Sequence, residues 1–466
     1  MSTVPSYPFV ARFSESANRH LVLPNSLLVG EFGSFANKTM KIRHSETTAR
    51  VKREHPTIDP ALIIALDDLT EEIQSNAMLK PLKYKDPEQE RAWMASHTHR
   101  GDRCWNDVSF LEAECYYFTR MHHLFLACSI KDVFAPHKQQ KLTASLSFAQ
   151  SLAEVHWNNL LEASGSQSFN QDQLRYYCMM SMWGNAADMC FHIHQKDTQQ
   201  SVHHLTAMSH TRHQLLVDEL DAFCAYMQAL EASDQDSIVI DMVLDNCGEE
   251  LAADLLFCDY LWQAAPRSQQ GKRRKIVLHV KSTPTHVSDV MSRDIYNTLH
   301  YWMAAGSAKG ASQPLSRCAH RLATLLSYHD VEIKPSHFWN GPQALWEAPP
   351  ELLDHFKSSS SLLILKGDLN YRRLVGDYAW PASCPLQAVT AYLSTPHLVL
   401  RTLKSWAVLG VPIEVEAKLS HEDTHWRTNG TKAVAHFVQP IQSESVGEGR
   451  GDGDEGKGRS SGSGDG

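Results

Sequence analysis

The sequence predicts an α/β protein in which a helical N-terminal region precedes a parallel sheet flanked by helices. Up to about residue 233, apolar residues recur every three or four positions, which is the spacing of amphipathic helices. From about residue 234, short apolar runs alternate with helical segments, as in parallel βαβ units with right-handed crossovers. We therefore expect a helical domain at 1–234 and an α/β domain at 235–442. Residues 443–466 are rich in Gly, Ser and acidic residues, so we expect a disordered tail.

The individual elements follow from the same two patterns. Apolar stripes predict helices in the N-terminal region at 110–128, 146–161, 174–189 and 213–230. Apolar runs predict buried strands at 237–246, 275–281, 362–365 and 397–401. Between them, helices are predicted at 248–262 and 287–304, and a helix leading into a strand at 322–333. The segment 411–417 predicts an edge strand, where Pro412 is tolerated.

Composition narrows the class of protein. The chain has 466 residues, of which 42% are hydrophobic and 21% charged, which is typical of a soluble globular protein of one to three domains. Its net charge of −9 argues against general affinity for nucleic acid. Ten cysteines occur without paired spacing, which predicts reduced thiols and a cytoplasmic protein. The sequence shows neither a signal peptide nor an apolar run of about 18 residues, so we expect no contact with a membrane. Composition leaves the oligomeric state open.

The segment 361–374 is the most informative stretch. An apolar run ends at Lys366, and Gly367, Asn370 and two arginines follow at the start of a predicted helix. Ligands of open α/β sheets bind at the carboxyl ends of strands, and a helix N-terminus there favours anions. The segment therefore predicts a phosphate-binding loop. An ordinary strand-to-helix turn with a basic edge would also explain it.

Two other strands end in residues that suit a metal ion. Asp245 and Asn246 are the last two residues of the strand predicted at 237–246, and Asp289 comes after the next strand. Carboxylate and amide oxygens are hard ligands suited to Mg²⁺ or Mn²⁺. An Asx turn with Asn246 as N-cap is the alternative for the pair, and Asp289 alone would also serve as an N-cap. Lys404 follows the strand at 397–401, so Lys366 and Lys404 are predicted to neutralise phosphoryl oxygens at the same edge.

A histidine-rich stretch at 192–213 offers a competing metal site, with His-x-His and His-His spacings. Its ligands would have to come from a polar linker, and no cysteine or acid has matching helical spacing. We interpret it as a connection between helices.

Several motifs together resemble the metal-dependent damage-control phosphatases, in the subfamily marked by an Arg-Thr-x-Lys motif and also described as protein-glutamate O-methyltransferase-like. The resemblance spans about 35–411. It is carried by Val243-Leu-Asp-Asn-Cys-Gly-Glu-Glu-Leu251, Val287-Ser-Asp289, Lys366-Gly-Asp-Leu-Asn-Tyr-Arg-Arg-Leu-Val-Gly-Asp377, Arg401-Thr-Leu-Lys404, Ala113-Glu-Cys-Tyr116 and Trp183-Gly-Asn-Ala-Ala-Asp188. Two features depart from the family pattern: Glu249 stands where an aromatic residue is usual, and the ending at 426–438 is degraded.

The resemblance implies a Rossmann-like α/β/α sandwich capped by an all-helical N-terminal domain. It implies a phosphatase that hydrolyses phosphate monoesters of small metabolites, such as fructose 1-phosphate, with Mn²⁺, Co²⁺, Ni²⁺ or Mg²⁺. By position it places the metal on Asp245, Asn246 and Asp289. It places the substrate on Asp245, Asn246, Lys366, Gly367, Asp368, Leu369, Asn370 and Lys404.

The alternative activity is carboxyl methyl transfer from S-adenosylmethionine, to which the family's second name refers. The first βα turn has a single glycine, Gly248, rather than the Gly-rich turn of a nucleotide site, so we expect a phosphatase.

For the phosphatase, the catalytic candidates are Asp245, Glu250, Lys366 and Lys404. An aspartyl-phosphate route through Asp245 usually needs an acid two residues later, where this chain has Cys247. We therefore expect in-line attack by a water that the metal activates, with Glu250 or Glu114 handling protons.

Overall fold

The structure is a computed structural model that describes residues 23–84, 86–94, 96, 101–163, 169–184, 214–263, 272–306 and 313–440. Within the described residues a seven-stranded sheet forms the centre of the fold. Its strands are β1 (Leu215–Asp218), β2 (Ser237–Val243), β3 (Arg273–Lys281), β4 (Val331–Ser336), β5 (Leu362–Lys366), β6 (His397–Thr402) and β7 (Ala433–Val438). The spatial order is β1-β7-β6-β5-β2-β3-β4, and every pairing is parallel except that of β6 with β7.

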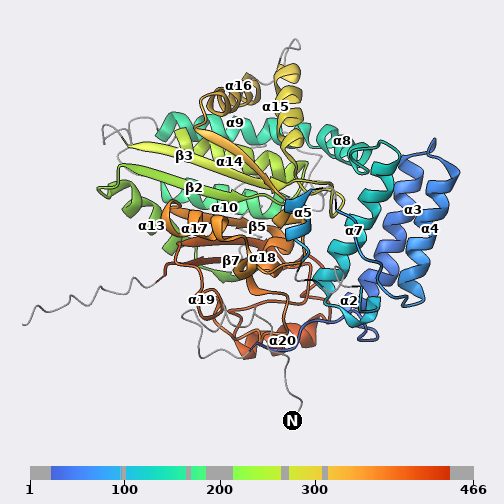
Figure 1. The fold of residues 1–466 in the computed structure, drawn as a ribbon. Helices are drawn as coiled ribbons and strands as arrows, with labels where there is room; N and C mark the ends of the chain where they lie inside the picture. The colour runs from blue at the N-terminus through green and yellow to red at the C-terminus, as the bar shows by residue number, and fades with distance from the viewer. Residues whose placement is uncertain are drawn as a thin grey trace, which may run out of the picture.

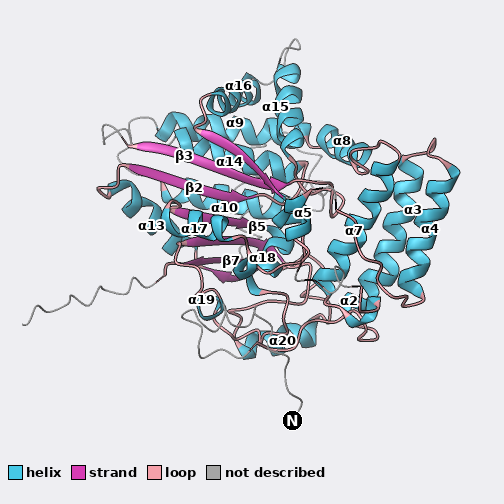
Figure 2. Ribbon diagram, in the orientation of Figure 1, coloured by secondary structure: helices cyan, strands magenta, loops and turns pink. Residues whose placement is uncertain are grey.

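Helices cover both faces of this sheet (Figures 1 and 2). One face packs against α9 (Leu146–Ala163), α10 (Gln171–Trp183), α13 (Leu220–Ala232), α14 (Glu249–Gln263), α15 (Ser292–Gly306) and α16 (Gln313–Ser327). The other face packs against α17 (Pro350–Ser358), α18 (Gly367–Val375) and α19 (Leu386–Val389). Alternation along β2 explains both cores, because Ile240 and Met242 enter the first and Val243 the second.

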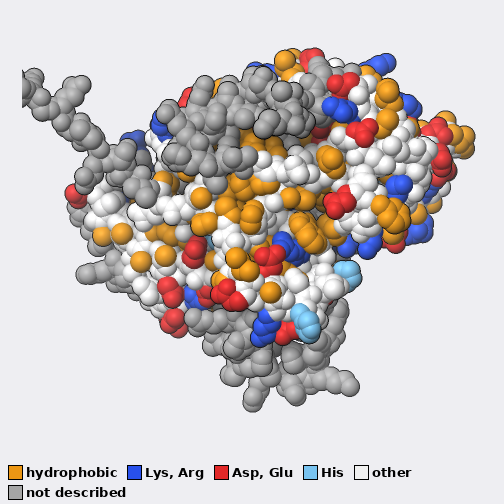
Figure 3. All heavy atoms as spheres, turned by 90° about the horizontal axis from the view of Figure 1, so that it is seen from below, with side chains coloured by type: hydrophobic (Ala, Val, Ile, Leu, Met, Phe, Trp, Pro, Cys, Tyr) orange, Lys and Arg blue, Asp and Glu red, His pale blue; other side chains and the backbone are white. Residues whose placement is uncertain are grey.

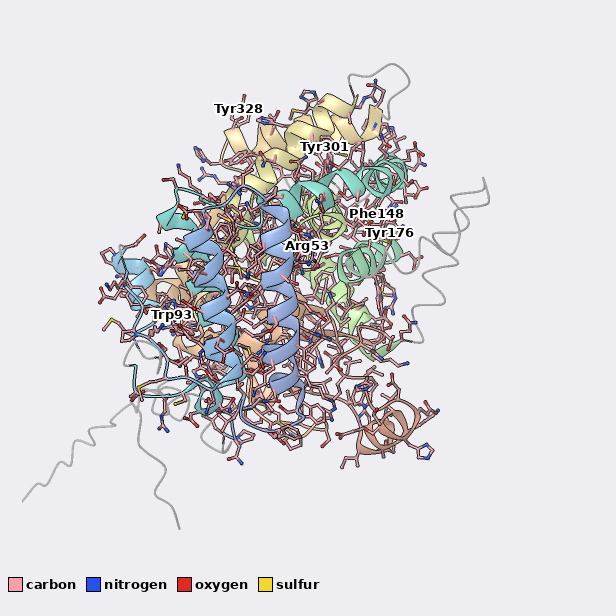
Figure 4. The ribbon with its side chains drawn as sticks, turned by 90° about the vertical axis from the view of Figure 1, so that its right-hand side faces the viewer. Arg53, Trp93, Phe148, Tyr176, Tyr301 and Tyr328 are labelled. Atoms are coloured by element: carbon pink, nitrogen blue, oxygen red, sulfur yellow. The ribbon has the colours of Figure 1, made fainter. Side chains whose placement is uncertain are left out.

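A third core belongs to the N-terminal helices. These are α2 (Phe35–Lys38), the π-helix η1 (Thr39–Arg43), α3 (His44–Glu54), α4 (Pro60–Gln74), α5 (Pro87–Arg91), α7 (Phe110–Ala127) and α8 (Ala135–Ala144). In Figure 4, α3 and α4 lie side by side at this end of the molecule, with Arg53 on α3. Leu369, from α18, is buried in the same core. The start of α18 therefore touches the helical region and the sheet at once.

The predicted α/β class and helical N-terminal region are confirmed. The four main predicted strands appear as β2, β3, β5 and β6, the passage at 322–333 as α16 and β4, and the predicted helices as α7, α9, α10, α13, α14 and α15. The helix predicted at 174–189 is described as far as Trp183. The tail at 443–466 and the histidine-rich stretch up to His213 lie outside the described residues.

Two predictions of secondary structure are wrong. The segment 411–417 does not form an edge strand, because Pro412 caps helix α20 (Ile413–Glu422), whose first turn carries Glu414 and Glu416. The N-terminal half is not wholly helical either, since β1 pairs with β7 at the sheet edge. That pairing joins segments more than 200 residues apart, which no local pattern reveals. The sheet and the layer of α9, α10 and α13 thus draw on residues before 234, and the domain boundaries stay predictions.

In the view of Figure 3, acidic and basic side chains are mixed among apolar ones. Among the described helices, none has the length and apolarity needed to cross a membrane. The cysteines in the described part of the chain are all free, as predicted.

Candidate active site

The predicted site residues gather where the direction of the strand order reverses. The chain runs outward from β2 to β3 and β4, then returns so that β5 pairs with the other side of β2. In open α/β sheets, such a switch point leaves a crevice at the carboxyl ends of the two strands. β2 ends at Val243, just before Asp245, and β5 ends at Lys366.

Asp245, Asn246 and Asp289 lie together at this edge, as the sequence predicts. Asn246 and Asp289 form an isolated antiparallel β-bridge, and the Val290 N–H donates to the Asp245 carbonyl oxygen at 2.9 Å. The Asn246 amide donates to Asp245 Oδ2 at 2.6 Å, and its Oδ1 accepts from the Ser288 hydroxyl at 2.6 Å. The two loops are therefore held to each other by both backbone and side chains.

The electrostatics of these acids favour a bound cation. Asp245 and Asp289 are 6% and 2% exposed, and Asp289 Oδ2 has no hydrogen-bond partner. Burial, together with the negative charges of Glu250 and Asp289, raises the pKa of Asp245 well above its usual value. Burial likewise raises the pKa of Asp289 to about 6. A divalent cation would offset this repulsion, and carboxylate and amide oxygens are ligands that Mn²⁺ or Mg²⁺ accepts, so the residues present fit such an ion.

Gly367 brings α18 into direct contact with the Asp245 carboxylate. Its φ is +83°, and a Cβ added there would lie 2.0 Å from Asp245 Oδ2. Only glycine adopts this backbone conformation without strain and also leaves room for the carboxylate.

Lys366 is fully buried, and its ammonium is already engaged. It donates to the Ser181 carbonyl oxygen at 2.6 Å and to Glu250 Oε1 at 3.1 Å, and it lies 3.1 Å from Asp254 Oδ1. Burial alone would lower the pKa of Lys366, but the two carboxylates raise it above the usual value. Because an ammonium has three N–H donors, Lys366 would have to exchange one partner to bind a phosphate.

Asp368 holds the loop that carries Lys404. Its Oδ1 accepts from Arg401 Nε at 2.8 Å and from the Lys404 backbone N–H at 3.1 Å. Burial would raise the pKa of Asp368, but the Arg401 guanidinium lowers it below its usual value. The Lys404 ammonium has no carboxylate partner among the residues that the structure describes. Asp368 therefore fixes the backbone of Lys404, while the ammonium is not paired with a described carboxylate.

The remaining predicted residues lie close by. The buried Asn370 amide donates to the Lys366 carbonyl oxygen at 2.8 Å and to that of Leu244 at 3.2 Å, whereas its Oδ1 has no partner. Leu369 packs into the helical core.

The two proton-transfer candidates differ in position. Glu250 Oε2 accepts from the Asn246 amide at 3.2 Å, so this carboxylate links Lys366 to Asn246. Glu114, from α7, instead accepts from Arg372 at 2.5 Å, and Asp377 holds the other side of that guanidinium. The Glu114 carboxylate therefore links α7 to α18 through this ion pair.

Sequence reasoning missed Lys281 and the turn after it. Lys281 ends β3, is 1% exposed, and lies 3.3 Å from Asp289 Oδ2. Its position as the last residue of the strand predicted at 275–281 was the available signal. His286 and Val287 both have positive φ, +42° and +67°. Such backbone costs on the order of 1–3 kcal/mol per residue and is typical of functional loops.

Among the described residues, two other groups of side chains could hold a metal ion. One combines Asp241, His279 and His355, and the other His156, Asp259 and Cys318. In the second group Arg321 already pairs with Asp259. In the first, both imidazoles lie within hydrogen-bond distance of Asp241 Oδ1, at 2.7 and 2.9 Å.

Comparisons with known proteins show which sequences and structures this chain resembles. A family model described as "Damage-control phosphatase ARMT1-like domain" matches residues 39–419. A Danio rerio protein named "Damage-control phosphatase ARMT1" is 28% identical over 89% of this chain and 89% of its own length. Proteins of the same name from Mus musculus and Homo sapiens are 26% and 24% identical over 90% of this chain and 99% and 100% of theirs. A crystal structure of a DUF89 family protein from Pyrococcus horikoshii covers 85% of this chain and 96% of its own, with 11% identity and a TM-score of 0.44.

Proposed function

This chain belongs to the ARMT1-like damage-control phosphatase family, and we propose that it hydrolyses phosphate monoesters of small metabolites such as sugar phosphates. One observation carries the proposal. The side-chain oxygens of Asp245, Asn246 and Asp289, of which both carboxylates are buried, lie at the same sheet edge as Lys404, an ammonium with no carboxylate partner in the described chain. Cation-binding oxygens beside a free ammonium suit a phosphoryl group.

Asp245, Asn246 and Asp289 would hold the divalent cation, for which we propose Mn²⁺, with Co²⁺, Ni²⁺ and Mg²⁺ as alternatives. When bound, the ion supplies a Lewis acid that polarises a phosphoryl oxygen and favours deprotonation of water. The Ser288 hydroxyl orients the Asn246 side chain by donating to its Oδ1. Gly367 leaves the space that the Asp245 carboxylate occupies.

The basic residues divide the remaining work. Lys404 would bind phosphoryl oxygens, and Asp368 fixes its position through the backbone N–H and Arg401. Lys366 contributes a positive charge from the buried end of β5 and orients Glu250, whose Oε1 accepts from it at 3.1 Å. Direct contact between Lys366 and phosphate would follow the release of the Ser181 carbonyl or one carboxylate.

Glu250 is our candidate for proton transfer. It lies one hydrogen bond from Asn246 and is buried, so its carboxylate sits between the proposed metal ligands and Lys366. Glu114 does not fit the role in this structure because it pairs with Arg372.

The first experiment is a substrate screen. Purified protein with Mn²⁺ or Co²⁺ should release phosphate from sugar phosphates and from p-nitrophenyl phosphate, and a chelator should stop the release. Asp289→Asn should lower turnover strongly, whereas Asp221→Asn, at an exposed carboxylate on α13, should not. Parallel incubation with S-adenosylmethionine would detect the alternative. Methyl transfer without phosphate release would overturn the proposal.

A further inference from the structure

Lys281 presents an unusual combination of burial and unused hydrogen-bonding capacity. It is the last residue of β3, next to the strand that leads to Asp245, and it is 1% exposed. Its ammonium has no hydrogen-bond partner among the described residues, although Asp289 Oδ2 lies 3.3 Å away. Neither atom is placed to hydrogen-bond the other. Burying an ammonium whose three N–H groups make no hydrogen bond costs free energy, unless a bound ligand supplies an acceptor.

Three other cations near the site, Arg372, Arg401 and Lys366, have acceptors within the protein. The Arg372 guanidinium bonds to Glu114 and Asp377, and Arg401 bonds to Asp368 and to loop carbonyl oxygens. Lys366 has three oxygen neighbours. The protein thus supplies hydrogen-bond acceptors to each of these three cations, whereas Lys281 has only its ion pair with Asp289, one of the proposed metal ligands.

The surroundings of Lys281 suit an anion near Asp245. Lys281 and Lys404 both lie near Asp245, and their positive charges oppose the rise in its pKa. His286, across the turn, is partly buried, and burial together with the nearby Lys281 charge lowers its pKa well below the usual value. No described carboxylate forms an aligned hydrogen bond with the Lys281 ammonium, so its N–H groups can donate to a ligand oxygen.

We propose that Lys281 is a substrate-binding residue that donates to a phosphoryl oxygen, with Lys404 as a second cation on the same group. The inference rests on the proposed function and adds a residue to that site. Binding by Lys281 would place a charge-assisted hydrogen bond in a buried setting, where such bonds are strong. The competing explanation is that Lys281 only neutralises Asp289 and thereby orders the metal ligands.

The test measures two affinities in the full-length chain. The variant is Lys281→Met, which keeps the stem of the side chain and removes the charge. The control is Lys275→Met, on the same strand, where the lysine is 43% exposed and pairs with Glu332 at the surface. Isothermal titration with inorganic phosphate, the product of the proposed reaction, is done with saturating Mn²⁺. Titration with Mn²⁺ alone is followed by the electron paramagnetic resonance of the free ion.

Lys281→Met should weaken phosphate binding roughly ten- to a hundredfold, the effect of losing one charge-assisted hydrogen bond. Mn²⁺ affinity should hold or rise, because a positive charge beside Asp289 is removed. Unchanged phosphate affinity would overturn the inference, and so would an equal loss of Mn²⁺ affinity, which would make Lys281 a positioning residue. If Lys281→Met does not fold, Lys281→Gln replaces it under the same criteria. Turnover of p-nitrophenyl phosphate by the wild type tests the proposed function separately. If the wild type hydrolyses this ester and Lys281→Met binds phosphate with unchanged affinity, only the inference about Lys281 is refuted.

Discussion

Replacing Gly367 by alanine should disable the site through one atom. The new Cβ would lie 2.0 Å from Asp245 Oδ2 and 2.3 Å from its Cγ. Ordinary contacts between such atoms are about 3.5 Å, so the carboxylate or the start of α18 must move by roughly 1 Å or more. A displacement of that size in catalytic groups costs on the order of a hundredfold in rate. We therefore expect Gly367→Ala to lower kcat/KM for p-nitrophenyl phosphate about a hundredfold and to weaken Mn²⁺ binding.

The matched control is Gly33→Ala. Gly33 has a φ of +76°, close to that of Gly367, but no atom lies within 4 Å of an added Cβ. Both variants should lose about 1–2 kcal/mol of stability from left-handed backbone, measured by chemical denaturation. Only Gly367→Ala should lose activity and Mn²⁺ affinity. Wild-type activity in Gly367→Ala, or an equal loss of activity in both variants, would refute the role assigned to the Asp245 contact.

Three further outcomes are expected. Lys404→Ala should raise KM for phosphate esters and lower turnover, about ten- to a hundredfold overall, and normal steady-state kinetics would remove Lys404 from the site. With a substrate made chiral at phosphorus by oxygen isotopes, hydrolysis should invert the centre, because water attacks once; net retention would indicate an aspartyl-phosphate on Asp245. Burial would raise the pKa of Asp241, but hydrogen bonds from His279 and His355 lower it to about 2. Because this pKa is below the unfolded value of about 3.9, Asp241 stabilises the fold by about 2 kcal/mol above pH 4, and the gain is lost as the pH falls toward 2. Asp241→Asn should show a smaller loss of unfolding free energy between pH 5 and pH 3 than wild type, and an equal loss would contradict this.

Local patterns were enough for the parts of the fold that bury continuous apolar runs. The run at Leu362–Lys366 is buried at every position, so its sequence shows no alternation and predicts a central parallel strand. The acids and lysines predicted at strand ends lie at one edge because parallel strands share a direction, which the sequence also implies. The closeness of Asn246 to Asp289 follows from the adjacency of β2 and β3.

Tertiary pairing explains what local patterns did not reveal. β1 is a four-residue strand whose position depends on β7, so its apolar residues were assigned to the following helix. Lys281 looked like an ordinary end of a strand, since its burial depends on the turn at 285–290 folding back over it. The engagement of Lys366 by Glu250 and Asp254 was equally hidden, because both acids come from another helix.

The start of α18 explains why so short a segment is so informative. Lys366 faces the acids of α14, Gly367 meets the carboxylate after β2, Asp368 holds the loop after β6, and Leu369 enters the core of the N-terminal helices. Successive residues of a helix point about 100° apart, so consecutive side chains at its first turn reach different neighbours. Each of these positions is therefore constrained by a separate part of the molecule. A conservative change at any one of them should therefore disturb a different part of the structure around the site.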